Sequence, residues 1–305
     1  MISVKGVVKR FGDFTALGGI DFEVADGTVY GLVGINGSGK STLLRILTDV
    51  YSPDEGVVLY DGVGVRDNPL IKRDIAFVAD ELYLPNNMNM STLAAKYDML
   101  YGRFNYAKMG KLAAEFELDV KKSFNSFSKG MRRQASTILA LCLEPRYLFF
   151  DETFDGLDPF KRSFVKSIIR EDARTRGTTV IITSHSLKEL EDVCDRLAVM
   201  NYGSLVLESD AESIGIGGIK VQIAFAEEYG ADKFSDLDVV KFTKNGSVSN
   251  VIIRGHAEVI KEKLEQMNPV LMEVLPLSLE EVFSHELESL GVRTFSADSI
   301  EKEAK

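Results

Sequence analysis

The pattern of hydrophobic and polar positions changes three times along the chain. In the first 65 residues, short apolar segments at 20–24, 29–33 and 57–60 are separated by turn signals at Asp26-Gly27 and Asp61-Gly62. Short apolar runs bounded by Asp-Gly pairs are typical of β-strands joined by tight turns. We therefore expect a strand-rich N-terminal region.

From about residue 92 to 143 the apolar positions take helical spacing, and we expect a helical region there. Two short, fully apolar runs follow at 147–150 and 179–183, with a charged amphipathic stretch at 160–174 between them. Continuous apolar runs joined by a helix are typical of buried parallel strands. The sequence thus predicts an α/β core with a parallel sheet.

A glycine-rich segment divides the chain. Three of the four residues at 215–218 are glycine, which is the residue that loses most backbone freedom on ordering. We place a boundary there, giving a larger domain at 1–215 and a smaller one at 219–305. The helical region, about 82–143, forms a subdomain of the first.

The smaller domain has its own pattern. Two apolar segments, 239–242 and 248–253, flank Asn245-Gly246, which is a strong hairpin signal. Residues 258–267 then take helical spacing. We expect a small α+β domain.

The composition of the chain disfavours nucleic acid as a partner, a disulfide or zinc site, and a membrane span. The 305 residues are 45% hydrophobic and 27% charged, as in globular proteins, with a formal net charge of −10 that disfavours nucleic acid as a partner. Cys142 and Cys194 lack disulfide or zinc spacing, and we expect both to be buried without function. No run approaches the roughly 20 apolar residues that span a bilayer, so we expect a cytoplasmic protein.

Residues 34–42 read Gly-Ile-Asn-Gly-Ser-Gly-Lys-Ser-Thr, between a predicted strand and a predicted helix. This is the pattern and context of a P-loop, whose backbone N–H groups converge on phosphates at a helix N-terminus. Lys40 supplies charge and Ser41 a hydroxyl for Mg²⁺. The sequence predicts ATP-binding contacts from Asn36, Gly37, Ser38, Gly39, Lys40, Ser41 and Thr42.

A second part of the site follows the apolar run at 147–150, where Asp151 and Glu152 stand together. Asp151 would hold Mg²⁺ directly or through water, and Glu152 would face the attacking water as general base. Two acids at a strand end are, in isolation, more often a solvated loop or a helix cap. The preceding P-loop favours the catalytic interpretation.

Four further segments lie before, between and after the P-loop and the Asp151-Glu152 pair in the sequence. Ser128-Lys129-Gly130-Met131 precedes the Asp151 strand, Asp155-Gly156-Leu157-Asp158 follows it, Thr183-Ser184-His185 ends the next apolar run, and Phe11 lies before Gly12. With these motifs, residues 2 to 215 resemble the nucleotide-binding subunit of an ABC transporter. In that family the first segment is the signature, usually Leu-Ser-Gly-Gly-Gln; here Phe127 replaces the leucine and Lys129 the first glycine.

The resemblance implies roles for these residues. Asp158 belongs to the D-loop, His185 is the catalytic switch histidine beside Glu152 and Lys40, and Phe11 stacks on adenine. Simpler alternatives remain, since Ser128 would also cap a helix, and a lone histidine or phenylalanine is more often structural.

The resemblance also implies an architecture and partners. The fold would be a P-loop NTPase of the ABC ATPase type, with an N-terminal antiparallel β subdomain, a RecA-like core and a helical subdomain. Two nucleotide-binding subunits, identical or different, would face each other head to tail, with ATP and Mg²⁺ between one P-loop and the other's residues 128–131. A separate membrane-spanning permease would receive the motion through residues 80–101 and hold the subunit at the inner face of the membrane.

One position departs from the family. Many members carry Gln where this chain has Asp80, after residues 75–79. A carboxylate accepts hydrogen bonds only, whereas an amide also donates. We expect Asp80 to contact Mg²⁺ with Ser41 and Asp151; the alternative is that it only begins an exposed turn.

The C-terminal segment hints at the direction of transport. Residues 278–283, Ser-Leu-Glu-Glu-Val-Phe, are similar to a segment of exporter-type ATPases of multidrug and lantibiotic resistance systems. An ordinary capping box, with Ser278 and Glu281, explains the same residues. The sequence therefore predicts an exporter ATPase subunit, with two alternatives: a soluble ABC-type ATPase acting on ribosomes or DNA, and a small-molecule kinase.

Overall fold

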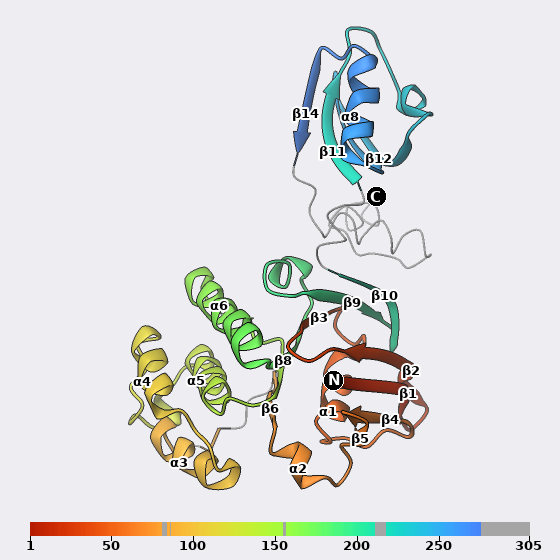
Figure 1. Cartoon of the computed structure of the whole chain (residues 1–305). Helices are drawn as coiled ribbons and strands as arrows, with labels where there is room; N and C mark the ends of the chain where they lie inside the picture. Colours follow the sequence, from red (N-terminus) through yellow and green to blue (C-terminus); the bar gives the residue numbers. More distant parts are fainter. Residues whose placement is uncertain (81–83, 86, 155–156, 211–217, 276–305) are drawn as a thin grey trace. The chain divides into compact units, whose positions relative to one another are not determined.

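The computed structural model describes residues 1–80, 84–85, 87–154, 157–210 and 218–275. The chain divides into two compact units, Met1–Glu208 and Ser209–Lys305 (Figure 1). The predicted boundary at 215–218 falls mostly outside the described residues, and the first strand after it begins at Gly218.

The N-terminal region forms an antiparallel sheet with the strand order β2-β1-β4-β5. Strand β1 pairs antiparallel with β2 on one side and with β4 on the other. The four strands are β1 (Ile2–Phe11), β2 (Phe14–Val24), β4 (Glu55–Tyr60) and β5 (Val63–Gly64). The predicted antiparallel β subdomain is confirmed.

A second sheet of the first unit has the order β10-β9-β3-β8-β7-β6. Its strands are β3 (Val29–Val33), β6 (Ile75–Val78), β7 (Tyr147–Asp151), β8 (Thr179–Ser184), β9 (Arg196–Asn201) and β10 (Ser204–Asp210). The five strands from β9 to β6 pair in parallel, so the carboxyl ends of β3, β7 and β8 meet at one edge. Every residue of β7 and β8 is buried, which explains why both were visible as continuous apolar runs.

Helices cover both faces of this parallel sheet (Figure 1). Helix α1 (Lys40–Leu47) lies between the two sheets, where Leu43 and Leu44 share one core with Tyr30 and Phe149. Helix α6 (Pro159–Arg176) packs on the opposite face, against β3 and β8. Short helical turns, α2 (Pro69–Lys72) and η2 (Leu187–Glu189), connect strands.

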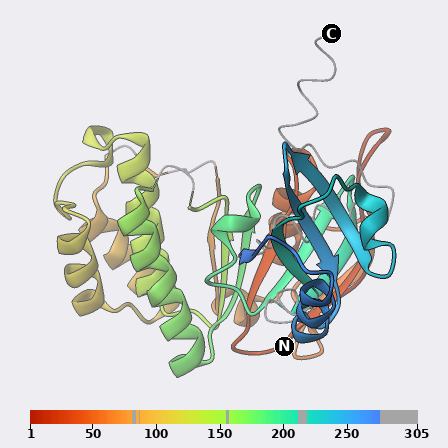
Figure 2. The ribbon, with the colours of Figure 1, turned by 90° about the horizontal axis from the view of Figure 1, so that it is seen from above.

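The helical subdomain follows β6 and lies beside the core, away from the antiparallel sheet (Figure 2). It contains α3 (Met90–Tyr101), α4 (Tyr106–Glu115), η1 (Phe124–Ser126) and α5 (Lys129–Cys142). Helix α5 contacts both α4 and β6, so it joins this subdomain to the sheet. No helix in the described part of the chain combines the length and apolarity that a membrane span requires.

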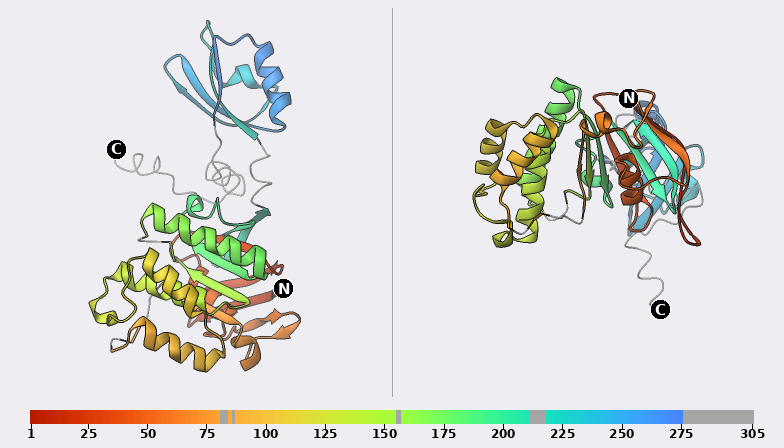
Figure 3. Two further views of the ribbon diagram at one scale, coloured as in Figure 1. Left: turned by 60° about the vertical axis from the view of Figure 1, so that its left-hand side comes forward. Right: turned by 90° about the horizontal axis from the view of Figure 1, so that it is seen from below.

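The described part of the second unit contains an antiparallel sheet with the strand order β12-β13-β11-β14 and the helix α8 (Figure 3). Its elements are β11 (Gly218–Ala224), η3 (Ala231–Phe234), β12 (Asp238–Asn245), β13 (Val248–Arg254), α8 (Ala257–Gln266) and β14 (Leu271–Leu275). The predicted hairpin at Asn245-Gly246 is confirmed, since Asn245 pairs with Val248. Ile260 and Leu264 of α8 share a core with the sheet, which gives the α+β arrangement expected. Residues 278–283 lie outside the described chain.

Candidate active site

The loop between β3 and α1 is shaped by glycines that no other residue could replace without movement. Gly39 precedes α1 with φ of 105°, and a Cβ atom there would lie 2.8 Å from the carbonyl oxygen of Ala16. At Gly34, a Cβ atom would lie 2.4 Å from the carbonyl oxygen of Met200. The loop is therefore pressed against neighbouring backbone, with the N-terminus of α1 at its end, as an anion-binding loop requires.

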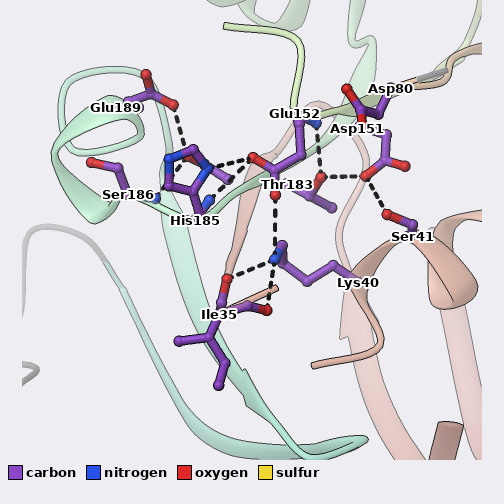
Figure 4. A network of polar contacts seen from close by, with 12 residues as sticks. Ile35, Lys40, Ser41, Asp80, Asp151, Glu152, Thr183, His185, Ser186 and Glu189 are labelled. Atoms are coloured by element: carbon purple, nitrogen blue, oxygen red, sulfur yellow. Dashed lines mark hydrogen bonds and ion pairs between the residues drawn. The ribbon is translucent and has the colours of Figure 1, made fainter. Parts of the chain in front are cut away.

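Lys40 lies in the middle of a polar network (Figure 4). Its Nζ donates hydrogen bonds to the carbonyl oxygens of Gly34, at 2.6 Å, and Ile35, at 3.2 Å. The same nitrogen is 3.2 Å from Glu152 Oε1. Because Lys40 is only 5% exposed, these oxygens supply the hydrogen bonds and counter-charge that a buried ammonium needs.

Asp151, at the end of β7, is buried and accepts two hydrogen bonds on one oxygen. Oδ1 accepts from Ser41 Oγ at 3.0 Å and from Thr183 Oγ1 at 2.7 Å. The other oxygen, Oδ2, is buried and has no hydrogen-bond partner among the described residues. A buried carboxylate oxygen without a partner is unfavourable, so the arrangement fits a cation beside Ser41 and Asp151.

The donor set suits Mg²⁺, which is usually held by one or two carboxylates together with waters and substrate phosphates. The described residues contain no cluster of three or more His, Cys, Asp or Glu side chains arranged for a metal. Thr183, which the sequence had marked only as the end of an apolar run, orients both acids: it donates to Asp151 and accepts from the Glu152 N–H at 3.1 Å.

Glu152 joins the end of β7 to the end of β8. Its Oε2 lies 3.0 Å from His185 Nδ1 and accepts a hydrogen bond from the His185 N–H at 3.2 Å. Glu152 has φ of 49°, in the left-handed region that is unfavourable for residues other than glycine. Such strained residues cluster at functional sites, where the surroundings fix a side chain in one place. Glu152 therefore contacts both Lys40 and His185.

Lys40, Ser41 and Glu152 line one pocket of about 310 Å³. Asp151, Thr183 and His185 are not among its lining residues. The pocket is lined by Phe11, Phe14, Ala16, Asn36, Gly37, Ser38, Gly39, Lys40, Ser41, Thr42, Asp80 and Glu152. All the residues predicted to bind ATP are among them. Phe11 is 46% exposed and Phe14 63% exposed, and the two are register partners across the turn that joins β1 to β2. Phe11 was predicted from the sequence and Phe14 was not, although Phe14 lies only two residues after Gly12.

Asp80 follows β6 and reaches the pocket, but its carboxylate is engaged elsewhere. Oδ1 forms an ion pair with the guanidinium of Arg133, from helix α5. Arg133 was not identified from the sequence, because no motif relates it to a residue 53 positions away.

The predicted signature lies apart from this pocket. Ser128 is the N-cap residue of α5, and its Oγ accepts a hydrogen bond from the Met131 N–H at 3.2 Å. Ser128 and Lys129 are exposed, and neither they nor Gly130 and Met131 line the pocket. In this chain Ser128 therefore caps a helix, and it leaves the segment accessible to another molecule.

Asp158 of the predicted D-loop is likewise a cap. It precedes α6 and accepts a hydrogen bond from the Lys161 N–H at 3.0 Å. Asp155 and Gly156 lie outside the described residues.

The fold and the pocket define a P-loop NTPase of the ATP-binding cassette type. A family model described as ABC transporter matches residues 17–155. The daunorubicin resistance ATP-binding protein DrrA3 of Streptomyces coeruleorubidus is 33% identical over 239 residues, 74% of each chain. The chain belongs to the ABC transporter family and is an ATP-binding subunit with ATPase activity.

Other similar proteins differ in coverage. The ABC transporter ATP-binding protein YtrB of Bacillus subtilis is 27% identical over 283 residues, 93% of this chain and 97% of its own length, so the similarity extends into the second unit. A sulfate/thiosulfate import ATP-binding protein, CysA of Neisseria meningitidis, is 31% identical over 70% of this chain and 62% of its own length.

Solved structures support the fold. A structure titled as the ATP-binding subunit of an ABC transporter superposes with a TM-score of 0.65, at 24% identity, over 70% of this chain and 91% of its own. The predicted fold class is confirmed for the first unit.

Proposed function

We propose that this chain powers an exporter: two such subunits bind ATP and Mg²⁺ between them, hydrolyse ATP, and drive a separate membrane-spanning permease. One observation carries the proposal. The P-loop residues and Glu152 line one pocket, and Asp151 is hydrogen-bonded to Ser41 beside it. The signature segment, residues 128–131, lies outside the pocket, with Ser128 and Lys129 exposed. The chain thus presents two complementary half-sites, which pair when two subunits meet head to tail.

In this arrangement each residue of the pocket has a physical task. The backbone N–H groups of residues 36–42 and the N-terminus of α1 bind the phosphates, with Lys40 as the fixed charge. Phe11 and Phe14 offer exposed rings for the adenine base. Ser41 and Asp151 hold Mg²⁺, which offsets the negative charge of the phosphates. Asp80 is the third predicted ligand, and in this structure its carboxylate pairs with Arg133.

Proton transfer falls to Glu152. Its carboxylate contacts Lys40 and His185 and is held by a strained backbone, so it is pre-oriented to accept a proton from the attacking water. His185, whose Nδ1 lies beside Glu152, would donate a hydrogen bond to the terminal phosphate. The Ser128 hydroxyl and the first N–H groups of α5 would bind that phosphate in the partner subunit.

Export is favoured by the relatives. The DrrA3 protein, named for daunorubicin resistance, aligns over more of its own length than the sulfate/thiosulfate import protein does. A permease partner would place the subunit at the cytoplasmic face of a membrane. The net charge of −10 disfavours the alternative of an ATPase acting on ribosomes or DNA.

The variant Glu152→Gln tests the catalytic assignment. We expect ATP hydrolysis to fall by roughly 10²- to 10⁴-fold, while ATP binding persists because the amide keeps the size of the carboxylate. Light scattering should then show an ATP-dependent dimer that does not dissociate. Hydrolysis at the wild-type rate would assign the base elsewhere.

The second experiment tests the partner. Affinity purification from detergent-solubilised membranes should recover the chain with a polytopic membrane protein, and vesicles containing both should lose substrate from the ATP-exposed side. Recovery with ribosomes instead would support the soluble alternative. Substrate moving toward the ATP-exposed side would replace export by import.

A further inference from the structure

Arg133 is a buried cation at the junction of three elements. It lies on α5, five residues after Ser128, and is 5% exposed. Its Nη1 donates to the carbonyl oxygen of Glu152 at 2.6 Å, at the end of β7. Its Nη2 donates to the carbonyl oxygen of Asp80 at 3.0 Å and forms the ion pair with the Asp80 carboxylate, after β6.

A guanidinium suits such a junction because it is planar and presents its donors in a fixed fork. The guanidinium of Arg133 is attached to α5 and is hydrogen-bonded to the carbonyl oxygen of Glu152, so a movement of α5 would also move the peptide group of Glu152. That peptide group follows a residue with φ of 49°, so its orientation needs an external hydrogen bond to persist. The Glu152 N–H is bonded to Thr183, which leaves the carbonyl for Arg133.

Burying the guanidinium requires a counter-charge. The Asp80 carboxylate supplies one, and an amide at position 80 would not. Where the family pattern places glutamine, this chain therefore has a matched pair, Asp80 with Arg133.

We propose that Arg133 is a positioning residue that fixes the catalytic carboxylate of Glu152 and ties it to the signature helix, and that Asp80 serves as its counter-charge rather than as a magnesium ligand. The positioning role of Arg133 rests on the proposed role of Glu152 as base. The counter-charge role of Asp80 does not, so the two roles can be tested separately.

A double-mutant cycle in thermal unfolding, on the full chain without nucleotide, tests the pair. Asp80→Asn and Arg133→Gln should each lower Tm by roughly 2–6 °C, and the double variant by no more than the larger single change. Arg132→Gln is the matched control: Arg132 donates to the Phe124 carbonyl at 3.1 Å, and its effect should add to that of Asp80→Asn. Additive effects of Asp80→Asn and Arg133→Gln would refute the pair.

Magnesium dependence separates the two roles of Asp80. In Asp80→Asn, the Mg²⁺ concentration that gives half-maximal binding of a fluorescent ATP analogue should stay within about twofold of wild type, because a counter-charge lies outside the metal shell. Asp151→Asn, the positive control, should raise it about tenfold or more. A comparable rise in Asp80→Asn would restore Asp80 as a ligand and overturn this half of the proposal.

Arg133→Lys tests positioning. Lysine keeps the positive charge for Asp80 but cannot hold two elements with one rigid fork. We expect kcat for ATP hydrolysis to fall about tenfold, with KM for ATP within about twofold and Tm near wild type. Arg132→Lys should change none of these. An unchanged kcat in Arg133→Lys would refute the positioning role of Arg133, even if Glu152→Gln proves inactive. An active Glu152→Gln would instead refute the role of Glu152 as base, and the double-mutant cycle of Asp80 and Arg133 would still test their pairing.

Discussion

The two units of this chain bury their residues in different ways. Among the described residues, the buried polar and charged side chains lie in the first unit, with the one exception of Ser249. Lys40 lines the proposed nucleotide pocket, and Asp151 and Thr183 are hydrogen-bonded to each other beside it. The core of the second unit consists of aliphatic and aromatic side chains. Burying polar groups lowers stability unless they are paired, so their concentration in the first unit agrees with the functional site proposed there.

The largest expected effect is the loss of ATP hydrolysis when a buried lysine of the first unit is removed, and it tests whether the two units differ in function. Lys40→Ala removes the fixed charge of the P-loop, and ATP hydrolysis should fall by about 10³-fold, with weaker ATP binding. The matched change in the second unit is Lys244→Ala, which removes an ammonium 4.4 Å from the ring centroid of Tyr229. That variant should hydrolyse ATP at the wild-type rate in a steady-state assay. A loss of activity with Lys244→Ala would mean that the second unit contributes to catalysis.

The second prediction concerns the aromatic core of the second unit. Phe234 is fully buried and contacts the rings of Phe225, Tyr229 and Phe242. Phe234→Ala should destabilise this unit by about 3–5 kcal/mol, because it leaves a cavity. Hydrogen exchange with mass spectrometry should show faster exchange in residues 218–275 and unchanged exchange at the nucleotide pocket. Equal acceleration in both units would show that they unfold together.

The third prediction uses a thiol that only the first unit has. Burial raises the pKa of Cys142, on α5, from 9.0 to about 12. In the unfolded chain the thiol ionises above about pH 9, while in the folded chain it stays protonated. Its contribution to stability is therefore present below pH 9 and is lost as pH rises from 9 toward 12.

Hydrogen exchange of the α5 backbone between pH 8 and pH 10.5 measures this loss of stability. Wild type should lose about 2 kcal/mol more than Cys142→Ala over this interval, since 1.5 pH units of differential ionisation correspond to that free energy. The second unit should show no difference between wild type and Cys142→Ala. Equal pH dependence of α5 in both proteins would show that the thiol is not shielded as the structure indicates.

The sequence identified the features whose information is local. Residues 34–42 form their loop from their own glycines, and the apolar runs of β7 and β8 reflect burial on both faces. Asp151 and Glu152 follow directly from the end of β7. Each of these is determined within about ten residues of chain.

The features that the sequence did not reveal depend on contacts between distant segments. Thr183 orients Asp151 across two neighbouring strands. Phe14 is the exception, because it lies only three residues after Phe11, with which it pairs. Arg133 meets Asp80 only after α5 has packed on β6. Periodicity predicts which face of α5 is buried, but it does not say which carboxylate an arginine on that face will meet.

The smallest expected effect concerns Ser249, the exception in the second unit. Its Oγ is fully buried and has no hydrogen-bond partner among the described residues. A buried hydroxyl without a partner is unfavourable, and alanine removes it at the expense of a very small cavity. Ser249→Ala should therefore raise the stability of the second unit by up to about 1 kcal/mol, measured by exchange in β13, with ATP hydrolysis unchanged. Ser38, inside the P-loop, is the matched test in the first unit, because its Oγ is also buried without a hydrogen-bond partner in the described part of the chain. If Ser38→Ala stabilises the first unit and slows ATP hydrolysis, the unpaired hydroxyl of Ser38 reflects function. If Ser249→Ala stabilises the second unit and leaves hydrolysis unchanged, the unpaired hydroxyl of Ser249 reflects only incomplete packing.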